Sequence, residues 1–178
     1  MNFNIRYYGE DYPQIADSAF IDPSAVIIGK VTIGANSSVW CNAVARGDVS
    51  YISIGENSNI QDLTMLHVTH FNPGRTNETP LIIGSNVTIG HNCCLHACTL
   101  EDNVFIGIGS TILDNVYIEK NVMIGAGSLV PQGKRLESGY LYFGNPVHQI
   151  RPLSQAEIEH IEYSAKHYVK IAAKHKNS

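Results

Sequence analysis

Three histidines near the middle of the chain, His67, His91 and His96, have the type and spacing of metal ligands. Neutral imidazole is a common ligand of Zn²⁺, and three such ligands leave a fourth coordination position open for water. Zn²⁺ held in this way lowers the pKa of its bound water to about 7, so hydroxide is available at neutral pH. The three histidines therefore predict a metal centre for hydrolysis or hydration. Four polar residues stand close to them in the sequence: Arg46, Asp48, Gln61 and Asp62.

The four cysteines do not offer a competing metal site. Cys41, Cys93, Cys94 and Cys98 include no CxxC pair, and their spacing fits no closed zinc site. Adjacent cysteines rarely bridge each other, and disulfide-stabilised domains are usually shorter and richer in cysteine. We therefore expect reduced thiols that fill the core of a cytoplasmic protein.

A six-residue repeat of aliphatic or small residues must position the histidines. It begins at Ile21, Ile27 and Ile33, slips by three residues before Ile54, and runs with two further irregularities to Val130. Gly often follows the aliphatic residue directly, and Asn is common two places after this Gly. Both residues suit the backbone of a tight corner. A period of six fits neither an α-helix nor a simple alternating strand. Three short strand-and-turn units make a triangular coil of about eighteen residues, and stacked coils share one core.

We therefore expect an all-β fold in a single domain over residues 1–178, a left-handed parallel β-helix of hexapeptide repeats with a C-terminal α-helix. Its parts are an N-terminal segment (1–18), the β-helix (19–133) with a loop (69–80), an extended segment (134–153) and the helix (154–176). The loop lacks aliphatic residues and is rich in turn formers. The helix should begin at Ser154, because Ser154 and Glu157 have the spacing of a capping box.

The repeat also predicts how the polar residues are arranged. Arg46, His67 and His96 each follow an inward-facing residue, so all three should lie on one face of consecutive coils. Neighbouring strands are about 4.8 Å apart, a spacing that lets His67 and His96 share one metal ion. His91 falls in a turn on another face and meets the other two only if a second subunit presents it. A three-fold homotrimer would create three such shared sites.

Composition excludes several kinds of partner. Twelve Lys and Arg against sixteen Asp and Glu give a formal charge of −4 and a pI near 6.0. There is no basic field for nucleic acid and no cationic run for an anionic membrane surface. No run of 18 apolar residues predicts a transmembrane helix, and the first twenty residues do not resemble a secretory signal. We expect a cytoplasmic protein that binds neither nucleic acid nor membrane.

Three motifs resemble those of the γ-class carbonic anhydrase family: ARGDVSYISIG (45–55), NIQDLTMLHV (59–68) and IGHNCCLHA (89–97). The similarity covers nearly the whole chain and is greatest to the short bacterial hexapeptide-repeat members. It implies that His67, His91 and His96 bind the metal between subunits of a homotrimer. It also implies a lyase whose three-histidine-bound hydroxide attacks CO₂ in the reversible formation of bicarbonate. Zn²⁺ is the expected cofactor, and Fe²⁺ or Co²⁺ suit the same ligands.

The same resemblance implies roles for other residues. Arg46 and Asp48 correspond to an ion pair at the subunit interface, and a purely structural salt bridge there is an equal alternative. Asp62 corresponds to a supporting partner of the metal ligands, and Gln61 to the residue that orients the attacking water. Tyr142, in the segment GYLYFG, is expected to enter the pocket.

The chain departs from the family at the acidic residues that remove the reaction's proton. Val49 stands where the best-known members have Glu, and the loop offers His70 and Glu78 instead of an acidic cluster. Histidine as a residue type can exchange protons near neutral pH, so His70 is a candidate replacement, and a solvated loop histidine is the alternative. Two other functions remain open. One is a catalytically silent metal-binding or scaffold protein, and the other is a coenzyme A-dependent hexapeptide acyltransferase.

Overall fold

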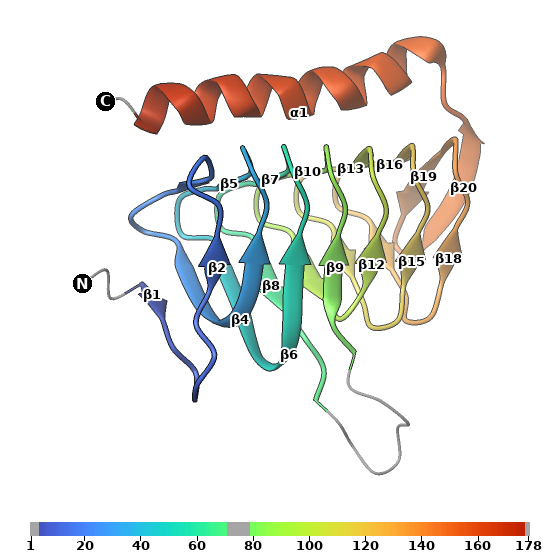
Figure 1. The fold of residues 1–178 in the computed structure, drawn as a ribbon. Coiled ribbons are helices and arrows are strands. Elements are labelled where there is room, and N and C mark those ends of the chain that lie inside the picture. The colour runs from blue at the N-terminus through green and yellow to red at the C-terminus, as the bar shows by residue number, and fades with distance from the viewer. Residues whose placement is uncertain (1–3, 71–78, 177–178) are drawn as a thin grey trace.

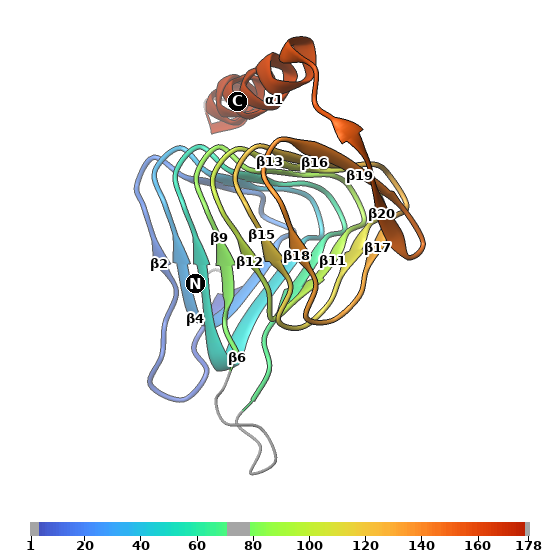
Figure 2. The same ribbon diagram turned by 90° about the vertical axis from the view of Figure 1, so that its right-hand side faces the viewer.

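The computed structural model describes residues 4–70 and 79–176, which form a parallel β-helix covered on one side by a single helix (Figure 1). Each coil has three sides, as the view in Figure 2 shows. The first face carries β3 (Phe20–Ile21), β5 (Ser38–Val39), β7 (Asn59–Ile60), β10 (Thr88–Ile89), β13 (Val104–Ile106), β16 (Val122–Ile124) and β19 (Tyr140–Gly144). The predicted left-handed β-helix with a C-terminal helix is confirmed.

The other two faces join into one twelve-stranded sheet. The second face holds β8 (Met65–His67), β11 (Cys94–His96), β14 (Thr111–Ile112) and β17 (Leu129–Val130). The third holds β9 (Leu81–Ile83), β12 (Thr99–Leu100), β15 (Tyr117–Ile118) and β18 (Arg135–Leu136). The long strands β4 (Val26–Ile33) and β6 (Val44–Ile54) pass from the second face to the third, and β1 (Ile5–Arg6) and β2 (Gln14–Ile15) pair with β4.

The residues of the six-residue repeat fill the interior of the coils. Ile27, Ile60, Leu66, Leu95 and Ile106 are each at most 1% exposed. Burial of one such side chain contributes about 1.5–3 kcal/mol, so a column of them through every coil drives the stacking. The repeat therefore fixes which residues point inward and, by alternation along each strand, which neighbours point outward.

Asparagine and glycine have different tasks at the corners. Asn36, Asn57 and Asn86 stack in adjacent coils with φ of 56–57°, the left-handed conformation expected there. The glycines that follow the repeat aliphatics have a different reason. Gly34 does not have positive φ, but a Cβ on it would lie 2.7 Å from the backbone of Gly55 in the next coil. These glycines allow close approach of coils instead of supplying φ above zero.

The β-helix continues beyond the expected boundary at residue 133. Leu136 and Tyr142 lie six and twelve residues after Val130, and both occupy the same inward position in the last coil. Their strands β18 and β19 pair in parallel with β15 and β16. The expected extended segment is thus a final coil followed by β20 (Val147–Pro152), which turns back antiparallel to β19.

The loop between β8 and β9 leaves a corner between the second and third faces. Thr69 and Thr79 close its base through two backbone hydrogen bonds of 3.1 Å. Glu78, which the sequence singles out, lies outside the described residues.

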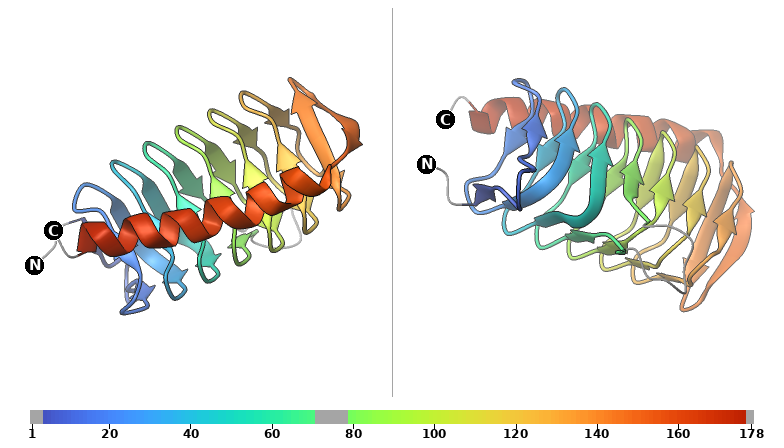
Figure 3. Two further views of the ribbon diagram at one scale, coloured as in Figure 1. Left: turned by 90° about the horizontal axis from the view of Figure 1, so that it is seen from above. Right: turned by 60° about the horizontal axis from the view of Figure 1, so that its bottom comes forward.

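Helix α1 (Gln155–Lys176) lies along the first face, across successive coils (Figures 1 and 3). Its N-terminus has the predicted capping box, since the Ser154 N–H donates to Glu157 Oε2 at 2.9 Å and the Glu157 N–H to Ser154 Oγ at 3.3 Å. Near its C-terminus, Tyr168 and Ala172 pack on Trp40 and Phe20. Among the described residues, no helix has the length and apolar character needed to cross a bilayer.

Candidate metal centre

Three adjacent strands bring Arg46, His67 and His96 side by side. Arg46 on β6 is in register with His67 on β8, and His67 with His96 on β11. In each strand the preceding residue points into the core, so these three side chains point outward on the second face. The stacking that the repeat predicts for these residues is confirmed.

The rings of His67 and His96 approach each other through one nitrogen each. His67 Nδ1 and His96 Nε2 are 3.1 Å apart. The other nitrogen of each ring faces a carboxylate: His67 Nε2 lies 3.1 Å from Asp48 Oδ1, and His96 Nδ1 lies 2.6 Å from Asp114 Oδ1. A carboxylate only accepts hydrogen bonds, so each neutral ring directs its single N–H to its acid. Both facing nitrogens are then left as acceptors.

This arrangement fits a divalent metal ion. Two imidazole nitrogens at about 2.0–2.1 Å from a tetrahedral ion would be about 3.3 Å apart, near the 3.1 Å between His67 Nδ1 and His96 Nε2. Carboxylates on the outer ring nitrogens are the usual support of metal-bound histidine. Within the described part of the chain, no third His, Cys, Asp or Glu joins the pair to complete a cluster.

The charges at the pair suit ligation at neutral pH. Burial, the largest effect, lowers the pKa of His67, although the bond to Asp48 opposes it. Burial by itself would raise the pKa of Asp48, but hydrogen bonds from Arg46 and His67 outweigh it and lower the pKa. Arg46 Nη1 is paired with Asp48 Oδ2. His67 is thereby kept neutral and Asp48 charged, the forms that a metal site requires.

Asp114 and Thr69 belong to this cluster, although the sequence analysis does not identify them. Thr69 Oγ1 donates to Asp114 Oδ2 at 2.6 Å, which leaves Oδ1 for His96. The signal that could reveal Asp114 is its distance of eighteen residues from His96, one full coil.

His91 lies in a turn at another corner, as expected. It follows β10, and its Nδ1 is 2.8 Å from Asp62 Oδ2 in the coil before. The Asp62 carboxylate holds the Nδ1–H, so Nε2 is the nitrogen that His91 offers as a ligand. The side chains of His91 and Asp62 are 43% and 38% exposed, so His91 is accessible from outside the chain.

Gln61 stands beside His91, away from the His67–His96 pair. Its backbone N–H donates to Ile89 O at 3.0 Å, and its side chain, 5% exposed, donates through Nε2 to Asn59 Oδ1 at 3.0 Å. It lines a cavity of about 340 Å³ between the corner and α1, together with Gly90, Phe105, Gly107, Ile108, Met123, Ile124, Gly125, Ala126, His160 and Ser164. The residues expected to act in the reaction thus form two separate groups on one chain, one around His67 and His96 and the other around His91 and Gln61.

The structure does not bring Tyr142 to either group. As the inward residue of β19 it is 3% exposed, and its hydroxyl accepts from the Glu137 N–H at 2.8 Å. The physical reason is that Tyr142 takes the place of a repeat aliphatic. His70 is exposed, three residues after His67 at the start of the loop.

The fold and site define a hexapeptide-repeat protein. Residues 12–47 and 97–132 match the family described as bacterial transferase hexapeptide (six repeats), and residues 80–113 match the hexapeptide repeat of succinyl-transferase. The chain is 44% identical over 158 residues to a probable carbonic anhydrase of Methanocaldococcus jannaschii, covering 89% of this chain and 95% of that one. It is 46% identical over 164 residues to gamma carbonic anhydrase 2, mitochondrial, of Arabidopsis thaliana, covering 92% of this chain and 58% of that one. The chain belongs to the γ-class carbonic anhydrase family.

Two further relatives have less specific names. Protein YrdA of Escherichia coli (strain K12) is 52% identical over 166 residues, covering 93% of this chain and 90% of that one. A solved structure from Bacillus cereus, described as a putative acetyltransferase, is 40% identical with a TM-score of 0.91 and covers 97% of this chain and 96% of that chain. The fold is therefore shared beyond proteins named as carbonic anhydrases.

Proposed function

We propose that the protein is a metal-dependent lyase that catalyses CO₂ + H₂O ⇌ HCO₃⁻ + H⁺. The observation that carries the proposal is the His67–His96 pair, whose facing lone pairs are fixed by Asp48 and Asp114. Membership of the γ-class carbonic anhydrase family supports the same reaction. Zn²⁺ is the proposed ion, with Fe²⁺ or Co²⁺ suited to the same donors.

The complete centre requires a second copy of the chain. His67 and His96 supply two ligands from one face, and His91 supplies the third from a corner of a neighbour. Leu63, Met65 and Ile108 are 60%, 36% and 55% exposed, and Leu63 and Ile108 lie at the same corner as His91. Leu63 also has φ of 62°, in a corner position that Asn42 and Asn92 occupy in the adjacent coils. Apolar side chains exposed around the third ligand support a homotrimer that buries them.

The chain's own residues divide the remaining work. His67, His96 and the His91 of a neighbouring copy would hold the ion, which would supply hydroxide near neutral pH because it would lower the pKa of a coordinated water to about 7. Gln61, beside His91, orients that water by a hydrogen bond. Asp48, Asp62 and Asp114 hold the three histidines in the tautomers that bind. His70, at the exposed start of the loop, passes the proton to solvent.

Stopped-flow CO₂ hydration, with metal content measured on the same anaerobically purified sample, tests the proposal. Hydration should follow metal occupancy, and His96→Ala should lose both while His148→Ala, on exposed β20, loses neither. A filled site without hydration would indicate the catalytically silent alternative.

The name of the Bacillus cereus structure favours acyl transfer as the second candidate. Saturable binding of coenzyme A, with no hydration, would favour that function over the first.

A further inference from the structure

A chain of buried polar side chains connects Gln61 to helix α1. Gln61 Nε2 donates to Asn59 Oδ1, Asn59 Nδ2 lies 3.0 Å from Thr88 Oγ1, and Thr88 Oγ1 lies 3.0 Å from Ser164 Oγ on the helix. The exposed fractions of Asn59, Thr88 and Ser164 are 0%, 1% and 9%. Burial of such groups without a partner is unfavourable, so each of these hydrogen bonds is favoured.

One backbone carbonyl fixes the direction of the bonds that join Gln61, Asn59 and Thr88. Asn59 Nδ2 also lies 3.4 Å from Val87 O, which can only accept. The amide of Asn59 therefore turns its NH₂ group toward Val87 and Thr88 and its oxygen toward Gln61. Gln61 must then direct its own NH₂ group to Asn59. Thr88, having accepted from Asn59, is free to donate its hydroxyl proton to Ser164.

These hydrogen bonds also fix the orientation of Gln61, the residue of the series that lies nearest the proposed site. Because one N–H of the Gln61 amide is bonded to Asn59, the amide is held in one orientation, and its Oε1 is the acceptor that Gln61 can offer in the cavity it lines. That oxygen accepts a hydrogen bond from the O–H of a water and cannot donate one. A water or hydroxide in the cavity would therefore donate one O–H to Gln61 and keep a lone pair for another partner.

We propose that helix α1 positions Gln61 for the reaction through Ser164 and Thr88. This inference rests on the proposed function, since it assigns Gln61 to the attacking water. Helix α1 covers β7 and β10, the strands that carry Asn59 and Thr88 (Figure 3). The helix is thus part of the apparatus that aligns the reacting groups, in addition to covering the first face.

The test is a double-mutant cycle. Thr88→Val removes the hydroxyl with little change of shape and should lower kcat about three- to tenfold, the effect of one buried hydrogen bond, with KM and metal content unchanged. Thr88→Ser should restore kcat, and Ser164→Ala should resemble Thr88→Val. In a Gln61→Ala background, Thr88→Val should cause no further loss. An equal further loss in that background, or no rescue by Thr88→Ser, would overturn the proposal.

A second readout separates this inference from the proposed function. Exchange of the Gln61 side-chain NH₂ protons with solvent, followed by NMR, should be slow in the native protein and faster in Thr88→Val. Ser37→Ala, which removes a buried hydroxyl bonded to Gly55 O elsewhere in the fold, should leave it slow. If metal-loaded protein hydrates no CO₂, the proposed function fails, and the exchange rates alone decide on the connection. Equal rates in native protein and Thr88→Val would disprove it.

Discussion

Asp114 Oδ1 lies 2.6 Å from His96 Nδ1, one coil further along the chain, and this contact determines which nitrogen of His96 faces His67. Thr69 holds the other oxygen of the same carboxylate. The ring is therefore oriented by a residue that need not touch the metal. The same relation recurs between Asp48 and His67 and between Asp62 and His91.

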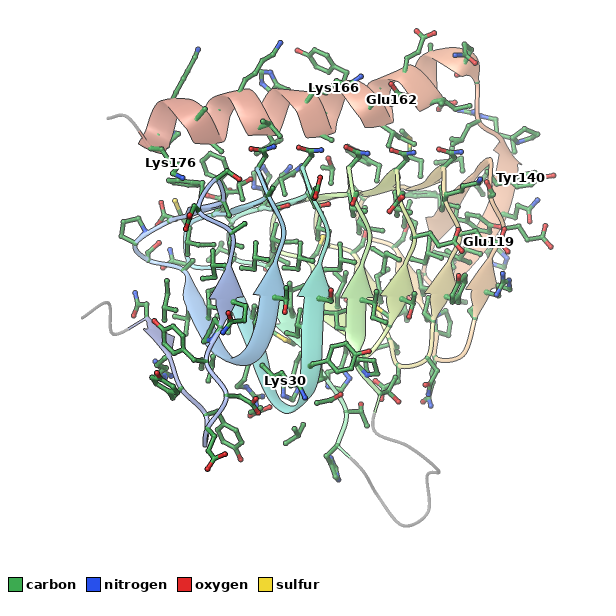
Figure 4. The ribbon with its side chains drawn as sticks, viewed as in Figure 1. Lys30, Glu119, Tyr140, Glu162, Lys166 and Lys176 are labelled. Carbon is green, nitrogen blue, oxygen red and sulfur yellow. The ribbon has the colours of Figure 1, made fainter. Side chains whose placement is uncertain are left out.

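Asp114→Asn should weaken metal binding about 10- to 100-fold, because an amide no longer fixes the tautomer of His96 as a carboxylate does. Competition with a chelator of known affinity measures the change. Glu119→Gln removes a different partly exposed carboxylate, paired with Arg135, and serves as the control with unchanged affinity (Figure 4). Equal metal affinity in native protein and Asp114→Asn would contradict the role of Asp114.

Mixing two inactive variants tests whether subunits share the centre. His91→Ala and His96→Ala should each be inactive, but random trimers formed from equal amounts should regain about one quarter of the native sites. That fraction arises because each site then needs an intact His67–His96 face and an intact His91 from two different chains. Hydration and metal content of co-refolded protein give the measurement.

The matched control for that experiment mixes His67→Ala with His96→Ala. Both changes damage the same face, so no combination of chains restores a site. Recovery in the control, or none in the first mixture, would show that the site is not divided in the proposed way.

His70→Ala should lower kcat roughly tenfold or more in weak buffer if His70 carries the proton to solvent. High concentrations of imidazole buffer should restore the rate, because a diffusible base then replaces the missing side chain. The measurement is stopped-flow hydration over a range of buffer concentrations, with His148→Ala as the surface-histidine control. A rate of His70→Ala that equals the native rate in weak buffer would assign His70 to the solvated surface.

Tyr142→Phe should leave hydration unchanged and lower stability by about 1 kcal/mol. Its hydroxyl accepts from the Glu137 N–H, lies 3.3 Å from Gln149 Oε1 and 3.4 Å from Glu137 O, and has no contact with the histidines. The change therefore removes only these hydrogen bonds. Denaturant unfolding and hydration rates on the same preparation are the measurements. Tyr140→Phe, on the same strand and more exposed, is the control (Figure 4). A large loss of activity with normal stability would show that Tyr142 takes part in the reaction.

The N-terminus of α1 should make stability depend on pH in acid. Arg151, at 2.8 Å, together with Ser154 lowers the pKa of Glu157 to about 2. An unfolded Glu has a pKa of about 4.3, so this carboxylate stabilises the fold fully above that pH and the effect is lost as pH falls toward 2.

Glu157→Gln should therefore lower the urea midpoint at pH 7, and its difference from the native protein should shrink progressively below pH 4. Glu162→Gln removes the Lys166 pair, whose side chains are exposed on α1, and should change the midpoint little at any pH (Figure 4). A Glu157→Gln difference that is constant from pH 7 to pH 3 would contradict the assigned pKa.

The sequence predicts the register of the site well because the six-residue period determines which residues stack on one another in adjacent coils. Once the repeat places Leu66 and Leu95 inside, His67 and His96 must adjoin on the outside. Asp114 escapes prediction because a single acid one coil away looks like any other surface residue. The connection through Thr88 and Ser164 escapes it as well, since the register of α1 on the coils is set by packing that no local pattern records.

The end of the β-helix shows a different limit. Leu136 and Tyr142 keep the period of six, but a tyrosine among aliphatics and a proline at position 131 obscure it. Tyrosine fits there because the final coil is covered by β20, so the ring is buried while its hydroxyl reaches Glu137 near the edge.

Helix α1 also affects how the protein unfolds. In a solenoid each coil contacts only its neighbours, so coils can detach singly from either end. Here the helix leaves the last coil after β20, bonds Thr88 at mid-length, and at its far end donates from Lys176 Nζ to Asp17 O, 2.6 Å away. Opening of the coils at one end must therefore also disturb α1, which is bonded to the coils at the other end. We therefore expect α1 to couple the opening of the two ends, so that the coils unfold cooperatively.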